Sequence, residues 1–148
     1  MELLNIDIGL KSYQLVEGGA PLVFNPSDPN VYARFMNAMD SIKAVEKEMA
    51  EKAGAVKQEE AGGEALRIMA ETDRRIKEIM NGIFGARNNF DEILCGVNLM
   101  GVTGNGDRVI NNLLNALTPI MEAGARACVD SEIAAAKLNR EQRRALGV

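Results

Sequence analysis

The chain has 148 residues, a formal net charge of −4, two cysteines and no histidine. This length fits one domain built around a single hydrophobic core. Because Cys95 and Cys128 lie far apart and no imidazole is present, a zinc site of the usual Cys and His ligands cannot be completed within one subunit. A conventional Ser or Cys nucleophile also lacks its usual partner. We therefore expect no enzyme, no metal and no cofactor, with both thiols reduced and mostly buried.

The composition predicts an adaptable aliphatic core in a soluble protein. Hydrophobic residues make up 47% of the chain but aromatic residues only 4%, and there are eight methionines. The apolar runs are far shorter than the roughly 20 residues that a membrane-spanning helix requires. The start, MELLNIDIG, lacks the basic region of a signal peptide. We expect a protein of the cytoplasm that does not enter membranes.

Residues 1–25 predict a β-hairpin. Glu17–Ala20 is a turn signal, and Leu22–Phe24 would form the returning strand. A pair of strands alone is marginal in water, so the hairpin should pack on the helices or pair with another subunit, which favours a homo-oligomer. The first strand is predicted from apolar residues that alternate with polar ones, namely Leu4, Ile6, Ile8 and Leu10.

A helical body is expected over residues 28–138. Asp28 suits the N-cap of its first helix and Pro29 the first helical position, and apolar residues at three- and four-residue steps continue to about Lys52. Gly62–Gly63 is the expected break before a second helix. That helix should run from Glu64 to a stop at Gly85, with an inward face of Leu66, Met69, Ile76, Ile79 and Ile83.

A short helix is expected over Asn89–Cys95, followed by a glycine-rich loop at residues 101–106. The loop lacks the Lys-Ser/Thr pair of a P-loop, so we interpret it as a flexible turn rather than a phosphate site. Asp107–Asp130 then predicts the central helix, with Asp107 as its N-cap and a kink at Pro119. Its apolar stripe must be covered by other elements.

The helix should continue past Asp130 as an arm, and Asn139–Gln142 fits a capping box that would start a last short helix. Four basic residues and one acidic residue between Lys137 and Val148 give this end a charge of +3, against −7 for the remainder. A basic tail at residues 139–148 suits an acidic or helical partner. The charges of residues 40–78 are mixed in sign, which is typical of a solvated helix face, so no nucleic acid is expected as partner.

These elements predict a mainly α fold, a helical bundle with a small N-terminal β-hairpin, organised as a single domain over residues 1–138 and a tail over 139–148. A partner-binding groove is predicted between the first long helix and the central helix, and a second contact in the tail. For the groove residues the alternative is plain core, and for the tail residues a solvated end. The candidates are Phe35, Met39, Leu114 and Met121 in the groove and Arg140, Arg143 and Arg144 in the tail.

The order of features resembles the tail assembly chaperones of long, non-contractile-tailed bacteriophages and related prophages, which are encoded between the tail tube gene and the tape measure gene. The likeness spans nearly the whole chain, but its motifs are packing and capping signals. It begins with the N-terminal hairpin. The other matching segments are Val23–Pro29 (VFNPSDP), Ile79–Gly85 (IMNGIFG), Cys95–Leu99 (CGVNL), Leu113–Met121 (LLNALTPIM) and Leu138–Leu146 (LNREQRRAL).

This resemblance implies a non-enzymatic role in the host cytoplasm. Such a chaperone coats the long, helical tape measure protein, keeps it soluble and yields as tail tube protein polymerises around it. Some members of the family also have a longer, frameshifted form. Two alternatives stay open: a structural virion component of the same gene neighbourhood, such as a connector or completion protein, and a small phage-encoded inhibitor of a host protein.

Overall fold

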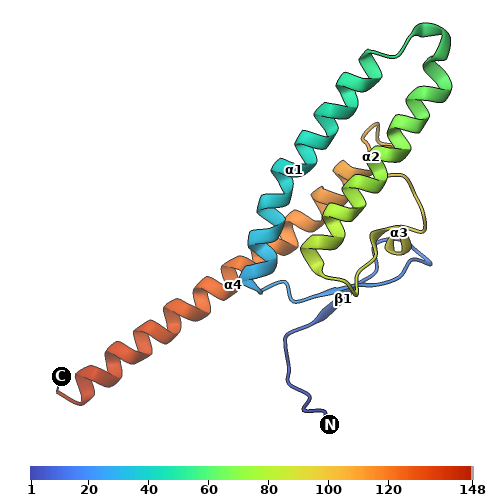
Figure 1. The fold of residues 1–148 in the computed structure, drawn as a ribbon. Helices are drawn as coiled ribbons and strands as arrows, with labels where there is room; N and C mark the ends of the chain where they lie inside the picture. The colour runs from blue at the N-terminus through green and yellow to red at the C-terminus, as the bar shows by residue number, and fades with distance from the viewer. Residues whose placement is uncertain (148) are drawn as a thin grey trace.

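The computed structural model describes residues 1–147 and shows a mainly α fold with one small β-hairpin, as the sequence predicts (Figure 1). Two long helices form an antiparallel pair, and a third long helix crosses their lower part and projects beyond it (Figure 1). The elements are β1 (Lys11–Tyr13), β2 (Leu22–Phe24), α1 (Pro29–Gly54), the short 3₁₀ helix η1 (Gln58–Glu60), α2 (Ala61–Phe84), α3 (Phe90–Ile93) and α4 (Val109–Ala145).

The start of α1 is the one predicted. The Asp28 carboxylate accepts a hydrogen bond of 2.9 Å from the backbone N–H of Asn30, and Pro29 occupies the first helical position. From there α1 continues to Gly54. Its buried stripe packs on α2 and consists of Val31, Phe35, Ala38, Ile42, Val45 and Met49.

Two details predicted for α2 are wrong. Gly62 and Gly63 lie inside the helix, because the chain reverses earlier, between Ala55 and η1. Leu66 was expected to face inward but is 67% exposed, since it lies where α2 extends beyond the rest of the core. The predicted stop is confirmed: α2 ends at Phe84, and Gly85 follows with a φ of +96°.

The central helix α4 is longer and less interrupted than predicted. Its N-cap is Arg108 rather than Asp107, because the Asp107 carbonyl is held by the backbone N–H and hydroxyl of Thr103, within the glycine-rich loop. The helix runs through Pro119 and past Asn139 to Ala145, so the predicted restart at Asn139 is wrong. The basic tail is therefore the end of one 37-residue helix, and Val148, its last residue, lies outside the described residues.

The first predicted strand is also wrong in its position. Leu4 to Leu10 form no strand and are exposed, and β1 begins only at Lys11. It pairs antiparallel with β2, with Ser12 opposite Val23. Alternating apolar residues favour an extended chain, but a strand also requires a neighbour to hydrogen-bond with, which the chain itself does not provide. The returning strand at Leu22–Phe24 is confirmed.

A chain of aromatic rings joins the hairpin to the helices. Phe24 packs against Tyr13 and Phe84, with ring centroids 5.4 and 4.7 Å apart, and Phe84 in turn contacts Phe90. Asn88, which is buried, closes the free edge of β2: its side chain accepts from the Val23 N–H at 2.8 Å and donates to the Val23 carbonyl at 2.9 Å. The hairpin is thereby fixed to the α2–α3 junction.

A buried charge ties α2 to α3. The Lys77 ammonium lies 3.0 Å from a carboxylate oxygen of Asp73 and 2.7 Å from one of Asp91, while Asp73 also accepts from the Leu99 N–H at 2.7 Å. Since every polar group in this set has a partner, we interpret it as a structural link. The expectation of buried thiols is wrong for Cys95, which is exposed at the end of α3, while Cys128 is half-buried on α4.

Candidate partner-binding surface

The predicted groove between α1 and α4 is filled in this structure. Phe35 and Met121 are buried in the hydrophobic core, with exposed fractions of 3% and 0%, and Met39 and Leu114 are half-buried and pack against that core. Phe35 and Met121 are therefore core residues rather than groove residues, because the facing stripes of the two helices already cover each other. The alternative stated for the groove residues, that they belong to the core, holds for these two.

A different surface stands out on α4. Its last buried residue is Gly124, and every residue from Val129 to Gly147 is exposed. We call residues 125–147 the C-terminal arm; its helical part extends about 30 Å at about 1.5 Å per residue. The arm points away from the α1–α2 pair and carries the C-terminus to the far end of the molecule (Figure 1).

One face of the arm is apolar near the body and basic near the end. Ala125, Val129, Ile133 and Ala136 recur at steps of three and four residues and so align along one side of the helix. We call these four residues the arm stripe. Val129 and Ile133 are 56% and 49% exposed, which is unusual for branched aliphatic side chains. Arg140 continues the line, with Arg143 and Arg144 on either side of it, so all three predicted tail arginines lie exposed at this end.

A hollow of about 210 Å³ lies at the base of the arm stripe, where α4 passes the start of α1. Its lining is largely apolar, so it continues the apolar face of the arm onto the body. The residues around it are Ser27, Asp28, Pro29, Tyr32, Ala125, Cys128 and Val129.

The arm is held at its base by a close approach between backbones. A methyl group on Gly124 would overlap the carbonyl oxygen of Pro26, so only glycine lets α4 come this near to the β2–α1 connection. Earlier in the same helix, the Thr118 hydroxyl, directly before Pro119, donates to the Leu114 carbonyl at 2.7 Å. The direction of the arm is thus set by the packed half of α4.

The arm differs in charge from the rest of the molecule. It has five basic and three acidic side chains, a net charge of +2, while the whole chain carries −4. The surplus of positive charge lies in the last turns, where it also complements the negative end of the helix dipole. The charged residues are Arg126, Asp130, Glu132, Lys137, Arg140, Glu141, Arg143 and Arg144.

The remaining polar features of the described residues are accounted for by structure. In the loop before α4, Thr103, Asn105 and Asn112 hydrogen-bond to one another through their side chains. Among residues 1–147, no group of three or more acidic or cysteine side chains is placed to hold a metal ion. Within the same range, no helix is both long and apolar enough to cross a membrane.

Comparison of the chain with family models, with curated proteins and with solved structures finds no match. The arm stripe was not among the predicted site residues. The signal that could have found it is the four-residue step from Ala125 to Val129 and Ile133, which sits about 120° away from the core stripe of Ile110, Leu113 and Leu117 on the same helix. An apolar line that diverges from the core stripe is a candidate for covering something outside the chain.

Proposed function

We propose that this protein is a phage tail assembly chaperone that binds the long, helical tape measure protein in the host cytoplasm and keeps it soluble. The role is non-enzymatic: apolar side chains of one protein cover apolar side chains of another. The resemblance in the hairpin, the capping junctions and the C-terminal segment suggests this class, and the arm supports it with a surface suited to the task.

The observation that carries the proposal is the exposed arm. A helix that projects about 30 Å with aligned aliphatic residues can lie along a second helix, in the way that amphipathic helices recognise each other through residues at three- and four-residue steps. The arm stripe and the hollow at its base form one continuous apolar face. A tape measure helix presents apolar patches that aggregate unless they are covered, and this face is suited to cover them.

The charge and size of the arm suit reversible binding. Arg140, Arg143 and Arg144 favour an acidic stretch of the partner beside its apolar patch. The arm stripe is narrow, so one copy should bind weakly, while many copies along one long partner would give a stable coat through avidity. Weak single contacts also let the coat be displaced as tail tube protein assembles. Recruitment of the tail tube protein itself rests on the resemblance alone.

Co-expression tests the proposal. A phage tape measure protein should stay in the soluble fraction with the wild-type chain and precipitate with a Val129→Asp/Ile133→Asp variant. The control is Leu66→Asp, which alters a more exposed leucine on α2 and should keep the partner soluble. A tape measure protein that is equally insoluble with and without the wild-type chain would count against the proposal.

A second candidate, a structural virion component, is favoured by a different feature, the uncovered apolar segment before β1, which could add to the sheet of a neighbouring virion protein. Mass spectrometry of purified mature particles separates the two candidates. A chaperone should be absent from the particles, whereas a structural component should be present in a fixed number of copies.

A further inference from the structure

The N-terminal segment before β1 has apolar side chains that nothing in the chain covers. It is extended and exposed, and its contact with the body is a hydrogen bond of 3.0 Å from the Asn25 side chain to the Ile8 carbonyl. Leaving so much aliphatic surface in water is unfavourable, at about 25 cal/mol for each Å². The exposed fractions are 84% for Leu3, 80% for Leu4, 78% for Ile6 and 54% for Ile8.

The β-hairpin has one closed edge and one open edge. Asn88 hydrogen-bonds both backbone groups of Val23, which shows that these groups point away from β1. In an antiparallel pair, the residue opposite must likewise point its N–H and carbonyl outward, and that residue is Ser12. Neither group of Ser12 has a hydrogen-bond partner within the described residues. The sheet can therefore gain a strand only beside β1.

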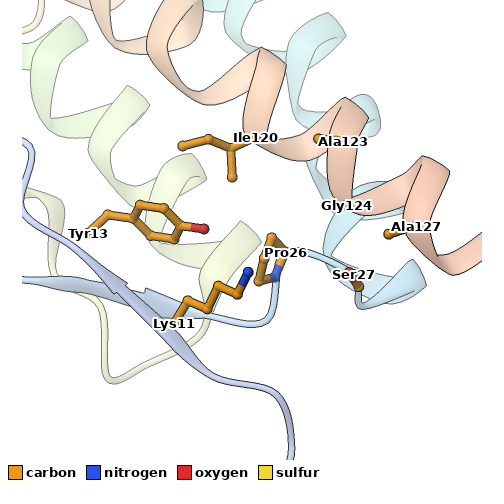
Figure 2. Close-up of a pocket in the computed structure, with 8 residues that line it drawn as sticks. All are labelled: Lys11, Tyr13, Pro26, Ser27, Ile120, Ala123, Gly124 and Ala127. Carbon is orange, nitrogen blue, oxygen red and sulfur yellow. The ribbon is translucent and has the colours of Figure 1, made fainter.

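A hollow of about 260 Å³ lies next to this open edge (Figure 2). Tyr13 and Lys11 project from β1 toward it, and α4 forms its opposite wall with Ile120 and a row of small residues (Figure 2). Ala123 and Ala127 are exposed, and their short side chains leave room for side chains that come from elsewhere. The full lining is Lys11, Tyr13, Pro26, Ser27, Ile120, Ala123, Gly124 and Ala127.

We propose that residues 3–8 of a second copy form a third strand on β1 and place aliphatic side chains in this hollow, so that two copies exchange their N-terminal segments. Each chain has an apolar N-terminal segment with no strand to pair with and an open β1 edge with no strand beside it. The segment of each copy can therefore pair with β1 of the other in a closed, two-fold dimer. Each copy then covers the segment of the other.

The dimensions and charges fit this occupant. In a strand, Leu4, Ile6 and Ile8 lie on one face at about 6.6 Å spacing, so one or two neighbouring side chains of this face can enter the hollow while Asn5 and Asp7 face the solvent. Glu2 lies on the same strand face as Leu4 and Ile6, and the one charged residue lining the hollow, Lys11, is of opposite sign.

The segment of the same copy points elsewhere in the structure. Asp7 accepts a hydrogen bond of 2.8 Å from the Gly9 N–H, Gly9 adopts a φ of +75°, and this turn directs the chain away from the body (Figure 1). The turn therefore presents the segment for exchange with a neighbour instead of folding it back on its own β1.

Light scattering combined with size exclusion tests the exchange. We expect the wild-type chain to be a dimer at tens of micromolar and an Ile6→Asp/Ile8→Asp variant to be a monomer with the same far-ultraviolet circular dichroism. A Val102→Asp variant, which changes an aliphatic residue of similar exposure in the loop before α4, should remain dimeric. A monomeric wild type, a dimeric Ile6→Asp/Ile8→Asp variant or a monomeric Val102→Asp variant would each overturn the proposal.

A cross-linking experiment shows which surfaces meet. In chains with Cys95→Ser and Cys128→Ser, one copy carries Ile6→Cys and another, of different mass, carries Ala127→Cys. Mild oxidation of the mixture should give a disulfide between the two masses. Leu66→Cys in place of Ile6→Cys is the control, and it should give none. Equal disulfide yields from the two pairs would exclude the exchange. So would a single chain carrying both Ile6→Cys and Ala127→Cys that forms the disulfide only within itself.

Discussion

Gly124 is the residue at which α4 and the β2–α1 connection come closest. In a Gly124→Ala variant the new methyl group would overlap the Pro26 carbonyl, so we expect the free energy of unfolding to fall by about 1–3 kcal/mol, as is typical for overpacking. The control is Gly82→Ala in α2, where nothing lies within 4 Å, and it should raise stability by about 1 kcal/mol. Urea unfolding measures the free energy of unfolding of both variants. If both substitutions changed it in the same direction, the close approach at Gly124 would not exclude a side chain.

Asn88 acts in place of a missing strand. Its side chain makes three hydrogen bonds, two to Val23 and one to the Phe84 carbonyl. Removing it in Asn88→Ala leaves polar backbone groups of a buried segment unpaired, which should cost about 2 kcal/mol of unfolding free energy. The matched change Asn115→Ala, at an exposed position of α4, should alter stability by less than about 0.5 kcal/mol. Equal effects would contradict the role given to Asn88.

Helix caps are predictable where they depend only on the residues next to them in the sequence. Asp28 with Pro29 is a helix start that a short stretch of sequence is enough to define. Asn89 caps α3 by accepting from the Asp91 N–H, a role that was not predicted because Asn89 was expected to lie inside the short helix. Asp107 and Asn139 carry the same type of signal, yet Asp107 is committed to the loop and Asn139 lies within a helix that has already formed. A capping residue in the sequence begins a helix only where the residues before it are not helical.

The α1–α2 pair has a link that depends on pH. The hydrogen bond from Arg75 to Glu48, at 2.7 Å, and then the one from Lys52 lower the pKa of the Glu48 carboxyl below its usual value of 4.5. A carboxyl with a depressed pKa in the folded state stabilises the fold above the unfolded-state pKa, and this contribution is lost as pH falls through the folded-state pKa. The Glu48 side chain is 42% exposed, and solvent screens its charge, so the effect is small.

We therefore expect a Glu48→Gln variant to melt slightly below the wild type at pH 7, and we expect this difference to shrink as the pH falls toward 3. Thermal unfolding followed by circular dichroism at the two pH values checks this. A difference in melting temperature that is equally large at pH 3 would show that the carboxylate charge is not its cause.

The arm is an element that the core does not need. Because every residue from Val129 to Gly147 is exposed, a chain that ends after Cys128 should lose less than about 1 kcal/mol of unfolding free energy. If the proposed function holds, the shortened chain should also fail to bind a tape measure protein. Urea unfolding and a pull-down check the two parts; loss of cooperative unfolding would mean that the arm belongs to the core.

Much of the architecture at the scale of whole elements was predictable, and the candidate site was not. Long periodic stripes define α1, α2 and α4, because a buried stripe of three or four turns outweighs single residues such as Gly62 and Pro119. Phe35 and Met121 are core residues rather than groove residues, because periodicity shows which residues are apolar but not what covers them: these two are covered within the chain, while Val129 and Ile133 are not.

At the scale of the whole molecule, the two uncovered apolar regions lie on separate elements. The segment before β1 is paired with an open edge of the same chain, which suits a second copy, and the arm stripe projects away from the body, which suits a different, helical partner (Figure 1). A dimer formed through the N-terminal segments would present two arms to one long partner, and linked arms would bind more tightly than either alone.

Hydrogen exchange of the chain mixed with its proposed partner, a phage tape measure protein, tests the central claim most directly. We predict that backbone amides of residues 125–145 become protected in the mixture by tenfold or more, while those of α1 and α2 keep the exchange rates of the free protein. Protection confined to α1 and α2, or no change in the arm at saturating partner, would contradict the account.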